Sequence, residues 1–283
     1  RPPLPESCTS PESICSKRLD ERPARPSAVA TSLTFAWRAL LKIKHVPEQL
    51  FDVLVSPVIF TLMFTYLFGG AIAGSTDAYI QFLLPGILVQ TIIIVTVYTG
   101  YTLNTDITKG VFDRFRSLPM SGLAVVAGRS LADLMDSVVG LAVVVAAGLA
   151  FGWRPDATAA QVLAAVALLL MLRFAMLWVG IYVGLKVRGA EAVSAVQVLV
   201  WPVLFLSSVF IDTSTMPRWL GIVAEANPLS ATATAVRELT GGPGWDAGGW
   251  FVDNATMLAV AYPVLIVVIF APLSVSAYRH LRR

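Results

Sequence analysis

Few side chains in this sequence belong to the types that carry out chemistry, and none stands in a catalytic arrangement. The two histidines lie far apart at His45 and His280, and the two cysteines, Cys8 and Cys15, have no second Cys or His pair beside them. A protein zinc site needs such pairs at close spacing. The sequence contains no GxxxxGK[ST] phosphate loop, no HExxH and no GxSxG. We therefore expect no catalytic residue, no metal and no cofactor in this chain.

The acidic pair Asp133 and Asp136 has a simpler explanation than catalysis. Arg129 precedes Asp133 by four residues, which is the spacing of an ion pair on one helix face. Arg173 is more unusual, because it interrupts a long apolar run. It either belongs to a substrate path or dimer seam, or it is neutralised by carbonyls or by a polar neighbour such as Gln197, Ser207 or Ser208.

The elements that must position these residues are apolar and long. Hydrophobic residues make up 56% of the chain and charged residues 14%, whereas soluble proteins carry about 25% charged residues. Roughly 20 apolar residues in a helix cross the ~30 Å hydrocarbon core of a bilayer. We predict an all-α integral membrane protein with six spans near residues 50–72, 80–103, 123–151, 159–187, 192–211 and 255–277. An unpaired arginine at the centre of such a span costs about 2.5–3.5 kcal/mol.

Lysine and arginine are distributed unevenly over the connections between the spans. Basic residues near span ends mark the cytoplasmic side. One side would hold only Arg154, Arg218 and Arg237. This bias predicts a multi-pass protein of the cell membrane with both termini in the cytoplasm, where the flanks hold Arg38, Lys42, Lys44, Lys109, Arg114, Arg116, Arg129, Lys186, Arg188, Arg279, Arg282 and Arg283.

We divide the chain into three parts. Residues 1–27 are rich in Pro, Ser, Glu and Arg and are predicted to be a disordered cytoplasmic tail. Residues 28–48 place a Trp/Leu face opposite a basic face and predict an amphipathic helix at the membrane surface. Residues 49–283 form the six-span domain, with a charged cytoplasmic loop at 104–122 and an external segment at 212–254. The middle of that segment, Leu229–Leu239, predicts a helix tucked back into the outer leaflet.

Several stretches resemble one family. They are PEQLFDVLVSPVIFTLMFTYLFGGAIAG at 47–74, YIQFLLPGILVQT at 79–91, LNTDITKGVFDRFRSLP at 103–119, MPRWL at 216–220 and NPLSATATAVREL at 227–239. In this order they resemble the daunorubicin/doxorubicin-resistance permeases, which are ABC-2 type membrane subunits of actinomycetes. The resemblance extends from about Glu21 over most of the chain.

The resemblance implies a type V exporter-like permease fold, with an N-terminal elbow helix and re-entrant external helices between spans 5 and 6. It implies a pair of permease copies working with a pair of ATP-binding cassette ATPase subunits, which hold the ATP and Mg²⁺. It also implies an external signature at Asn227, Pro228 and Arg237. It places a coupling helix at Asp113, Arg114, Phe115, Arg116 and Leu118, although the two arginines could instead serve only to fix the topology.

These observations together predict export of a hydrophobic or amphipathic drug, such as an anthracycline-like antibiotic. Aromatic side chains in the spans, including Phe60, Phe64, Trp201 and Phe205, either bind such a drug or only pack. An exporter of lipid or glycolipid is the alternative within the family. An ATP-independent channel or secondary carrier is the alternative outside it. Membrane lipids are expected neighbours, and nucleic acid is not an expected partner.

Overall fold

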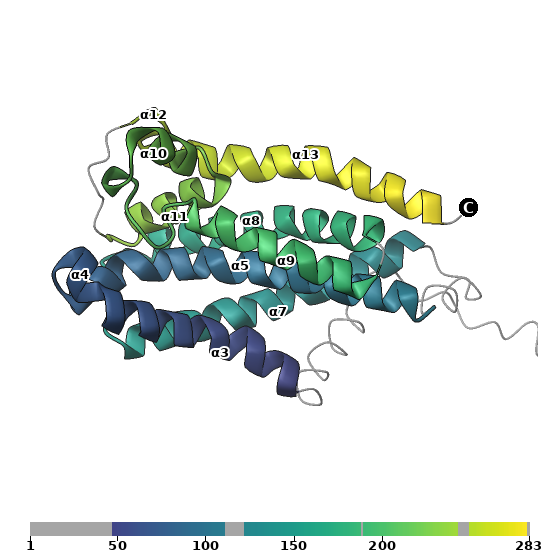
Figure 1. Cartoon of the computed structure of the whole chain (residues 1–283), viewed down its shortest axis with the longest axis horizontal. Coiled ribbons are helices and arrows are strands. Elements are labelled where there is room, and N and C mark those ends of the chain that lie inside the picture. Colours follow the sequence, from purple (N-terminus) through teal and green to yellow (C-terminus); the bar gives the residue numbers. More distant parts are fainter. Residues whose placement is uncertain (1–46, 111–121, 188, 243–248, 282–283) are drawn as a thin grey trace, which may run out of the picture.

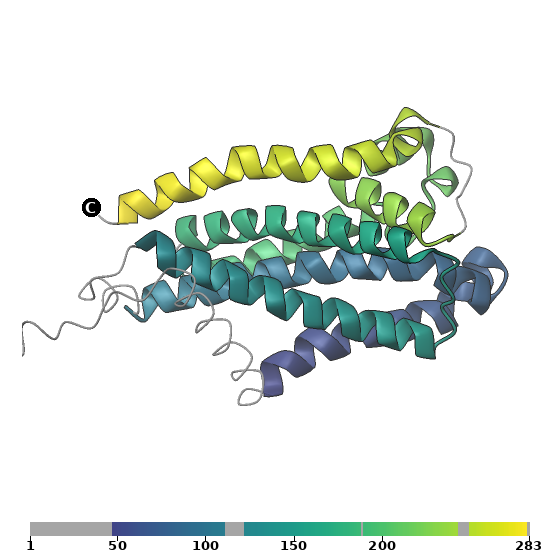
Figure 2. The same cartoon turned by 180° about the vertical axis from the view of Figure 1, so that it is seen from behind.

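The computed structural model describes residues 47–110, 122–187, 189–242 and 249–281, whose regular structure is helical throughout. The long helices lie side by side in one bundle (Figures 1 and 2). Five segments are long and apolar enough to cross a membrane, namely Val55–Ala73, Thr76–Thr108, Asp133–Ala150, Ala159–Lys186 and Ala255–Tyr278. They correspond to five of the six predicted spans and indicate a multi-pass membrane protein.

The first of these segments is not one continuous α-helix. It consists of α3 (Pro47–Met63), a π-helical turn η1 (Phe64–Phe68) and α4 (Gly69–Ala73). A π turn holds an extra residue and rotates the side chains that follow. Here the turn begins at Phe64, whose ring stacks on Phe210 with centroids 4.8 Å apart.

Helix α5 (Thr76–Thr108) is the centre of the bundle. In its most apolar stretch 83% of the residues are buried, against 22% for α13 (Ala255–Leu281). Ser75 caps its start by accepting a hydrogen bond from the Ala78 amide at 3.2 Å. The helix continues past its predicted end, so the segment predicted as a loop from residue 104 begins as helix. Buried Asn104 fixes this extension by donating to the carbonyls of Gly184 at 3.0 Å and Val187 at 2.6 Å.

Helix α8 (Ala159–Lys186) packs closely along α5. A Cβ atom at Gly180 would lie 2.7 Å from the Thr96 carbonyl oxygen, and one at Gly184 would lie 2.7 Å from that of Gly100. Small residues at such crossings let two membrane helices approach until their backbones touch. Helix α7 (Gly122–Ala150) packs on α3 and α5, and α13 packs on α8.

Helix α9 (Ala190–Phe205) is shorter than the predicted span at 192–211 and has only 16 residues. It ends early because a different residue takes its terminal carbonyls. The Asn227 amide donates to the Val203 carbonyl at 3.0 Å and to the Leu206 carbonyl at 2.9 Å. These bonds replace the intrahelical partners that a longer helix would have supplied.

The segment after α9 folds into short helices at one end of the bundle. They are η2 (Thr213–Thr215), α10 (Arg218–Glu225), α11 (Pro228–Leu239) and α12 (Trp250–Asp253). Helix α11 confirms the helix predicted at 229–239. These elements lie at the same end as α4, and the C-terminus lies at the other end (Figure 1). We call the two ends the α11 end and the C-terminal end.

Three predictions lie outside the described residues: the disordered tail at 1–27, the amphipathic helix at 28–48 apart from its last two residues, which begin α3, and the coupling segment Asp113–Leu118. They stay predictions. The helix ends that flank the coupling segment, Thr108 and Gly122, belong to α5 and α7.

Candidate functional site

Arg237 on α11 is buried at the α11 end of the bundle. Its Nε donates to the Phe82 carbonyl at 2.9 Å, and its guanidinium carbon lies 3.8 Å above the Phe82 ring. Its Nη2 donates to the carbonyls of Ser208 at 2.5 Å and Val209 at 3.3 Å. The guanidinium therefore joins α11 to α5 and to the turn that follows α9.

Burial of this cation is compensated locally. Burial lowers the pKa of Arg237 to about 9, and the nearby Asp212 carboxylate acts in the opposite direction. The group therefore stays charged at neutral pH. Gly86 makes the arrangement possible, since a Cβ atom there would lie 2.2 Å from the Val209 carbonyl oxygen. The Tyr79 hydroxyl also holds this turn by donating to the Phe210 carbonyl at 2.9 Å.

Asn227 and Pro228 begin α11 in the way their residue types predict. The Asn227 side-chain oxygen accepts from the Leu229 amide at 3.0 Å, which is an N-cap contact. Pro228 occupies the first helical position, where no backbone donor is needed. The amide nitrogen of the same Asn227 binds the last carbonyls of α9, as described above.

The predicted external signature is thus brought together on one structural element. Asn227 binds carbonyls at 203 and 206, and Arg237 binds those at 208 and 209. Both residues secure the turn between α9 and the short helices at the α11 end of the bundle. Apart from one bond from Arg237 Nη1 to the Ser208 hydroxyl at 3.3 Å, the hydrogen bonds of both residues go to backbone, so the geometry favours a structural clamp over a ligand contact.

Arg173 lies in the interior of the bundle with no exposed surface. Its Nε donates to the Ser137 hydroxyl at 2.6 Å, its Nη1 to Thr96 at 3.3 Å and its Nη2 to Thr99 at 3.1 Å. Each hydroxyl donates its own proton to the carbonyl four residues earlier. The oxygen lone pairs therefore face the guanidinium as acceptors.

The partners proposed for Arg173 from the sequence were wrong. The acceptors come from α5 and α7, and they are not Gln197, Ser207 or Ser208. Asp133 and Asp136 of α7 also act electrostatically on Arg173. The side chain of Arg129, the partner predicted for Asp133, lies outside the described side chains. These contacts support the structural interpretation of Arg173, and a role in the substrate path stays a prediction.

Some of the aromatic residues noted in the sequence form a cluster between α3 and α9. Phe60 stacks on Trp201 at 5.5 Å between ring centroids, and Phe205 lies 5.3 Å from Phe210. Phe205 is 48% exposed, so the edge of this cluster is accessible from outside the bundle. A planar apolar molecule could stack there.

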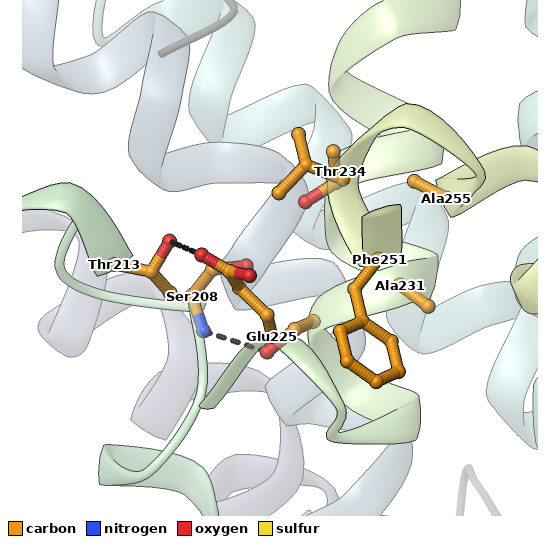
Figure 3. A pocket seen from close by; sticks show the side chains of 9 residues that line it. Ser208, Thr213, Glu225, Ala231, Thr234, Phe251 and Ala255 are labelled. Carbon is orange, nitrogen blue, oxygen red and sulfur yellow. Dashed lines mark hydrogen bonds between the residues drawn. The ribbon is translucent and has the colours of Figure 1, made fainter. Parts of the chain in front are cut away.

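A small pocket lies between the short helices at the α11 end and the start of α13 (Figure 3). It has a volume of about 20 Å³. The Glu225 carboxylate in it accepts from the Thr213 hydroxyl at 3.2 Å. No local pattern in the sequence predicts this pocket, because its lining comes from the turn after α9, from η2, α10, α11 and α12, and from the start of α13. The lining residues are Ser208, Thr213, Glu225, Ser230, Ala231, Thr234, Phe251, Val252 and Ala255.

Comparison with known proteins places the chain in a family. The family model described as "ABC-2 type transporter" matches residues 32–240. This chain belongs to the ABC-2 type transporter family. The ABC-2 chain is 46% identical over 261 residues to the daunorubicin resistance ABC transporter permease protein DrrB1 of Streptomyces coeruleorubidus, covering 92% of this chain and 90% of that protein.

Two more distant ABC-2 relatives carry the description "putative transport permease ycf38". The one from Porphyra purpurea is 24% identical over 214 residues, covering 74% of this chain and 73% of the relative. The one from Cyanophora paradoxa is 23% identical over 238 residues, covering 82% of each. The family match at residues 32–240 includes the clamp residues Asn227 and Arg237 of α11.

Proposed function

We propose that this chain is the membrane subunit of an ATP-driven exporter that moves a hydrophobic or amphipathic drug, such as an anthracycline-like antibiotic, out of the cell. The observation that carries the proposal is the 46% identity over 92% of the chain to a daunorubicin resistance permease. ATP and Mg²⁺ would be bound by a separate ATP-binding cassette subunit.

In this proposal α9 is the fifth span in chain order, the predicted span that is absent from the five long helices. A helix of 16 residues is about 24 Å long, somewhat less than the ~30 Å core. Helix α9 starts just after Lys186 at the C-terminal end of the bundle. The turn after it reaches Arg237 at the α11 end. The helix and its turn together therefore run the length of the bundle.

The proposed orientation puts the C-terminal end of the bundle in the cytoplasm and the α11 end outside. Lys109 follows α5 and Lys186 ends α8 at the C-terminal end, as the positive-inside rule requires. Helices α10, α11 and α12 would then form the re-entrant segment that closes the external mouth.

We place a second copy of the chain on α9. Gln197, in the middle of this helix, is exposed, and Val198 and Leu199 beside it are 67% and 68% exposed. An amide facing lipid has no hydrogen-bond partner, whereas two copies related by a two-fold axis can pair their amides. Disulfide cross-linking of Gln197→Cys should therefore give a dimer. Leu163→Cys on exposed α8 is the matched control, and equal cross-linking of the two would contradict this interface.

The segment Asp113–Leu118 would dock in the ATPase. Phe115 and Leu118 would be apolar anchors, and Arg114 and Arg116 would pair with acidic groups, since aromatic and arginine side chains suit interface hot spots. Changing Phe115 and Arg116 together to Ala should release the ATPase from membranes at normal permease levels. Retained co-purification would contradict docking and leave the arginines as topology signals. The amphipathic helix at 28–48 would rest on the membrane surface beside this contact.

The decisive experiment is uptake of fluorescent daunorubicin into inverted membrane vesicles that carry this chain and its ATPase. Uptake should require ATP, the permease and an intact phosphate loop in the ATPase. Vesicles lacking either subunit are the controls. Absence of drug uptake together with movement of a labelled lipid would identify the lipid exporter instead. Uptake without ATP would identify a channel or secondary carrier.

A further inference from the structure

The carboxylate of Glu225 lies in the pocket of Figure 3 with an unbalanced negative charge. Asp212, by contrast, lies close to Arg237 and offsets its charge. In the described part of the chain Glu225 has a hydroxyl partner, Thr213, but no cation is paired with it. A partly enclosed carboxylate of this kind favours a positively charged ligand.

The charges around the pocket also favour a positively charged ligand. The described residues at the α11 end carry six carboxylates and three guanidiniums. A surface of one net sign raises the local concentration of ligands of the opposite sign. These carboxylates are Asp77, Asp156, Asp212, Glu225, Glu238 and Asp253, and the guanidiniums are Arg154, Arg218 and Arg237.

The donors and acceptors in the pocket suit an organic ammonium better than a metal ion. Among the described residues no group of three or more His, Cys, Asp or Glu side chains is placed to hold a metal. An ammonium group has three N–H donors and no acceptor. Glu225, Thr213 and the Thr234 hydroxyl can accept from it, and the Phe251 ring beside them can add a cation–π contact.

The size of the pocket sets what the rest of the ligand must be. Its volume of about 20 Å³ is close to the space that one water molecule needs and far below the ~300–1,000 Å³ of sites that enclose a drug-sized molecule. The pocket therefore holds a head group, and the body must lie outside. Apolar side chains are exposed next to it: Ile222, one turn before Glu225, is 49% exposed, and Trp250, which contacts Phe251, is 60% exposed.

We propose that Glu225, with Thr213, Thr234 and Phe251, binds the ammonium group of a cationic amphiphile whose apolar body lies along α10 and α12. This assignment rests on the proposed function, because the orientation above makes the pocket an exit site on the outer side. It narrows the exported drug to molecules with a protonated amine.

A matched pair of compounds tests the assignment. Daunorubicin carries a protonated primary amine, and N-acetyldaunorubicin is the same molecule without that charge. In the vesicle assay, Glu225→Gln should lower transport of daunorubicin about tenfold below saturation, in the range expected for a hydrogen bond to a charged group. Transport of the N-acetyl compound should not change. Glu238→Gln is the control, because Glu238 is an exposed acid of α11 outside the pocket.

Two transport results would overturn the assignment. Daunorubicin transport by Glu225→Gln at the wild-type level would show that the carboxylate is not used. An equal loss for both compounds would show that Glu225 only supports the fold. Thr213→Val, which removes only the hydroxyl on Glu225, should produce a smaller loss that is again confined to the amine.

A binding assay separates failure of this site from failure of the proposed function. The full-length permease in nanodiscs, without ATPase, is titrated with each compound, and drug fluorescence is recorded. The Kd of daunorubicin should rise about tenfold in Glu225→Gln, and that of the N-acetyl compound should stay constant. If the wild-type complex exports neither compound, this difference in Kd still shows whether Glu225 binds the ammonium group. Equal Kd values for daunorubicin in the wild type and in Glu225→Gln would refute an ammonium site. Displacement of daunorubicin by millimolar Ca²⁺ but not by ethylammonium would also refute it.

Discussion

The hydroxyl groups around Arg173 allow a controlled test of what a buried guanidinium needs. Thr99 and Thr91 lie on the same helix, and each is 3% exposed. Each donates to the carbonyl four residues earlier, at 3.1 Å and 2.8 Å respectively. Thr99 also accepts from Arg173 Nη2 at 3.1 Å, and Thr91 has no such contact. Changing either threonine to Val keeps the shape of the side chain and removes its hydroxyl. Only Thr99→Val also removes a hydrogen bond to the charged Arg173.

The size of the effect follows from that difference. A hydrogen bond to a charged group contributes about 1.5–3 kcal/mol in water-soluble proteins. Side-chain hydrogen bonds between membrane helices reach at most about 1.7 kcal/mol. We therefore expect Thr99→Val to lower the free energy of unfolding by about 1–2 kcal/mol. Thr91→Val should lower it by less than about 0.5 kcal/mol, because a back-bond within one helix adds little.

Contact distance predicts an order among the three acceptors. Ser137 accepts at 2.6 Å, Thr99 at 3.1 Å and Thr96 at 3.3 Å, and shorter charge-assisted bonds are stronger. Ser137→Ala should therefore lower the free energy of unfolding most, and Thr96→Val should lower it least. The measurement is helix content by circular dichroism during unfolding of the purified permease in SDS mixed micelles. Equal losses for Thr99→Val and Thr91→Val would refute the view that these hydroxyls stabilise the buried charge.

Three further predictions use the same unfolding assay. Gly86→Ala should destabilise the permease by about 1–3 kcal/mol, the range for overpacking, because the new Cβ meets the Val209 carbonyl. Gly140→Ala is the control and should be neutral or stabilising, because nothing lies within 4 Å of its new Cβ. A larger loss of stability for Gly140→Ala than for Gly86→Ala would contradict the close contact. Asn227→Ser should lose the two contacts to the end of α9 but keep the cap of α11. It should therefore lower the free energy of unfolding by about 1 kcal/mol less than Asn227→Ala does. Equal losses in the two variants would argue against a separate contribution of the cap. Arg237→Lys should lower the free energy of unfolding by about 2–3 kcal/mol, because one ammonium group cannot reach the carbonyls of Phe82, Ser208 and Val209 at once. Arg218→Lys at the exposed start of α10 is the control and should leave the free energy of unfolding unchanged.

Local sequence patterns were enough to predict the elements of this bundle. An apolar run of sufficient length must be a spanning helix in a bilayer, since no other local structure satisfies its backbone there. The described part of the chain contains five such helices. The start of α11 was also predictable, because an Asn-Pro pair supplies both a cap and a first helical residue. By contrast, no local pattern reveals the π turn at Phe64–Phe68 or the early end of α9.

The environments of the charged groups could not be predicted in this way. Ser137 and Thr96 lie 36 and 77 residues from Arg173 in the chain, and neither differs locally from other hydroxyl residues in membrane helices. The Glu225 pocket likewise forms only when the turn after α9, η2, α10, α11, α12 and α13 meet. The amino-acid sequence by itself determined which segments cross the membrane and which residues carry charge, because hydropathy and helix capping act over a few residues. Only the tertiary structure decided which partners those charges meet, because the choice depends on how distant helices pack against one another.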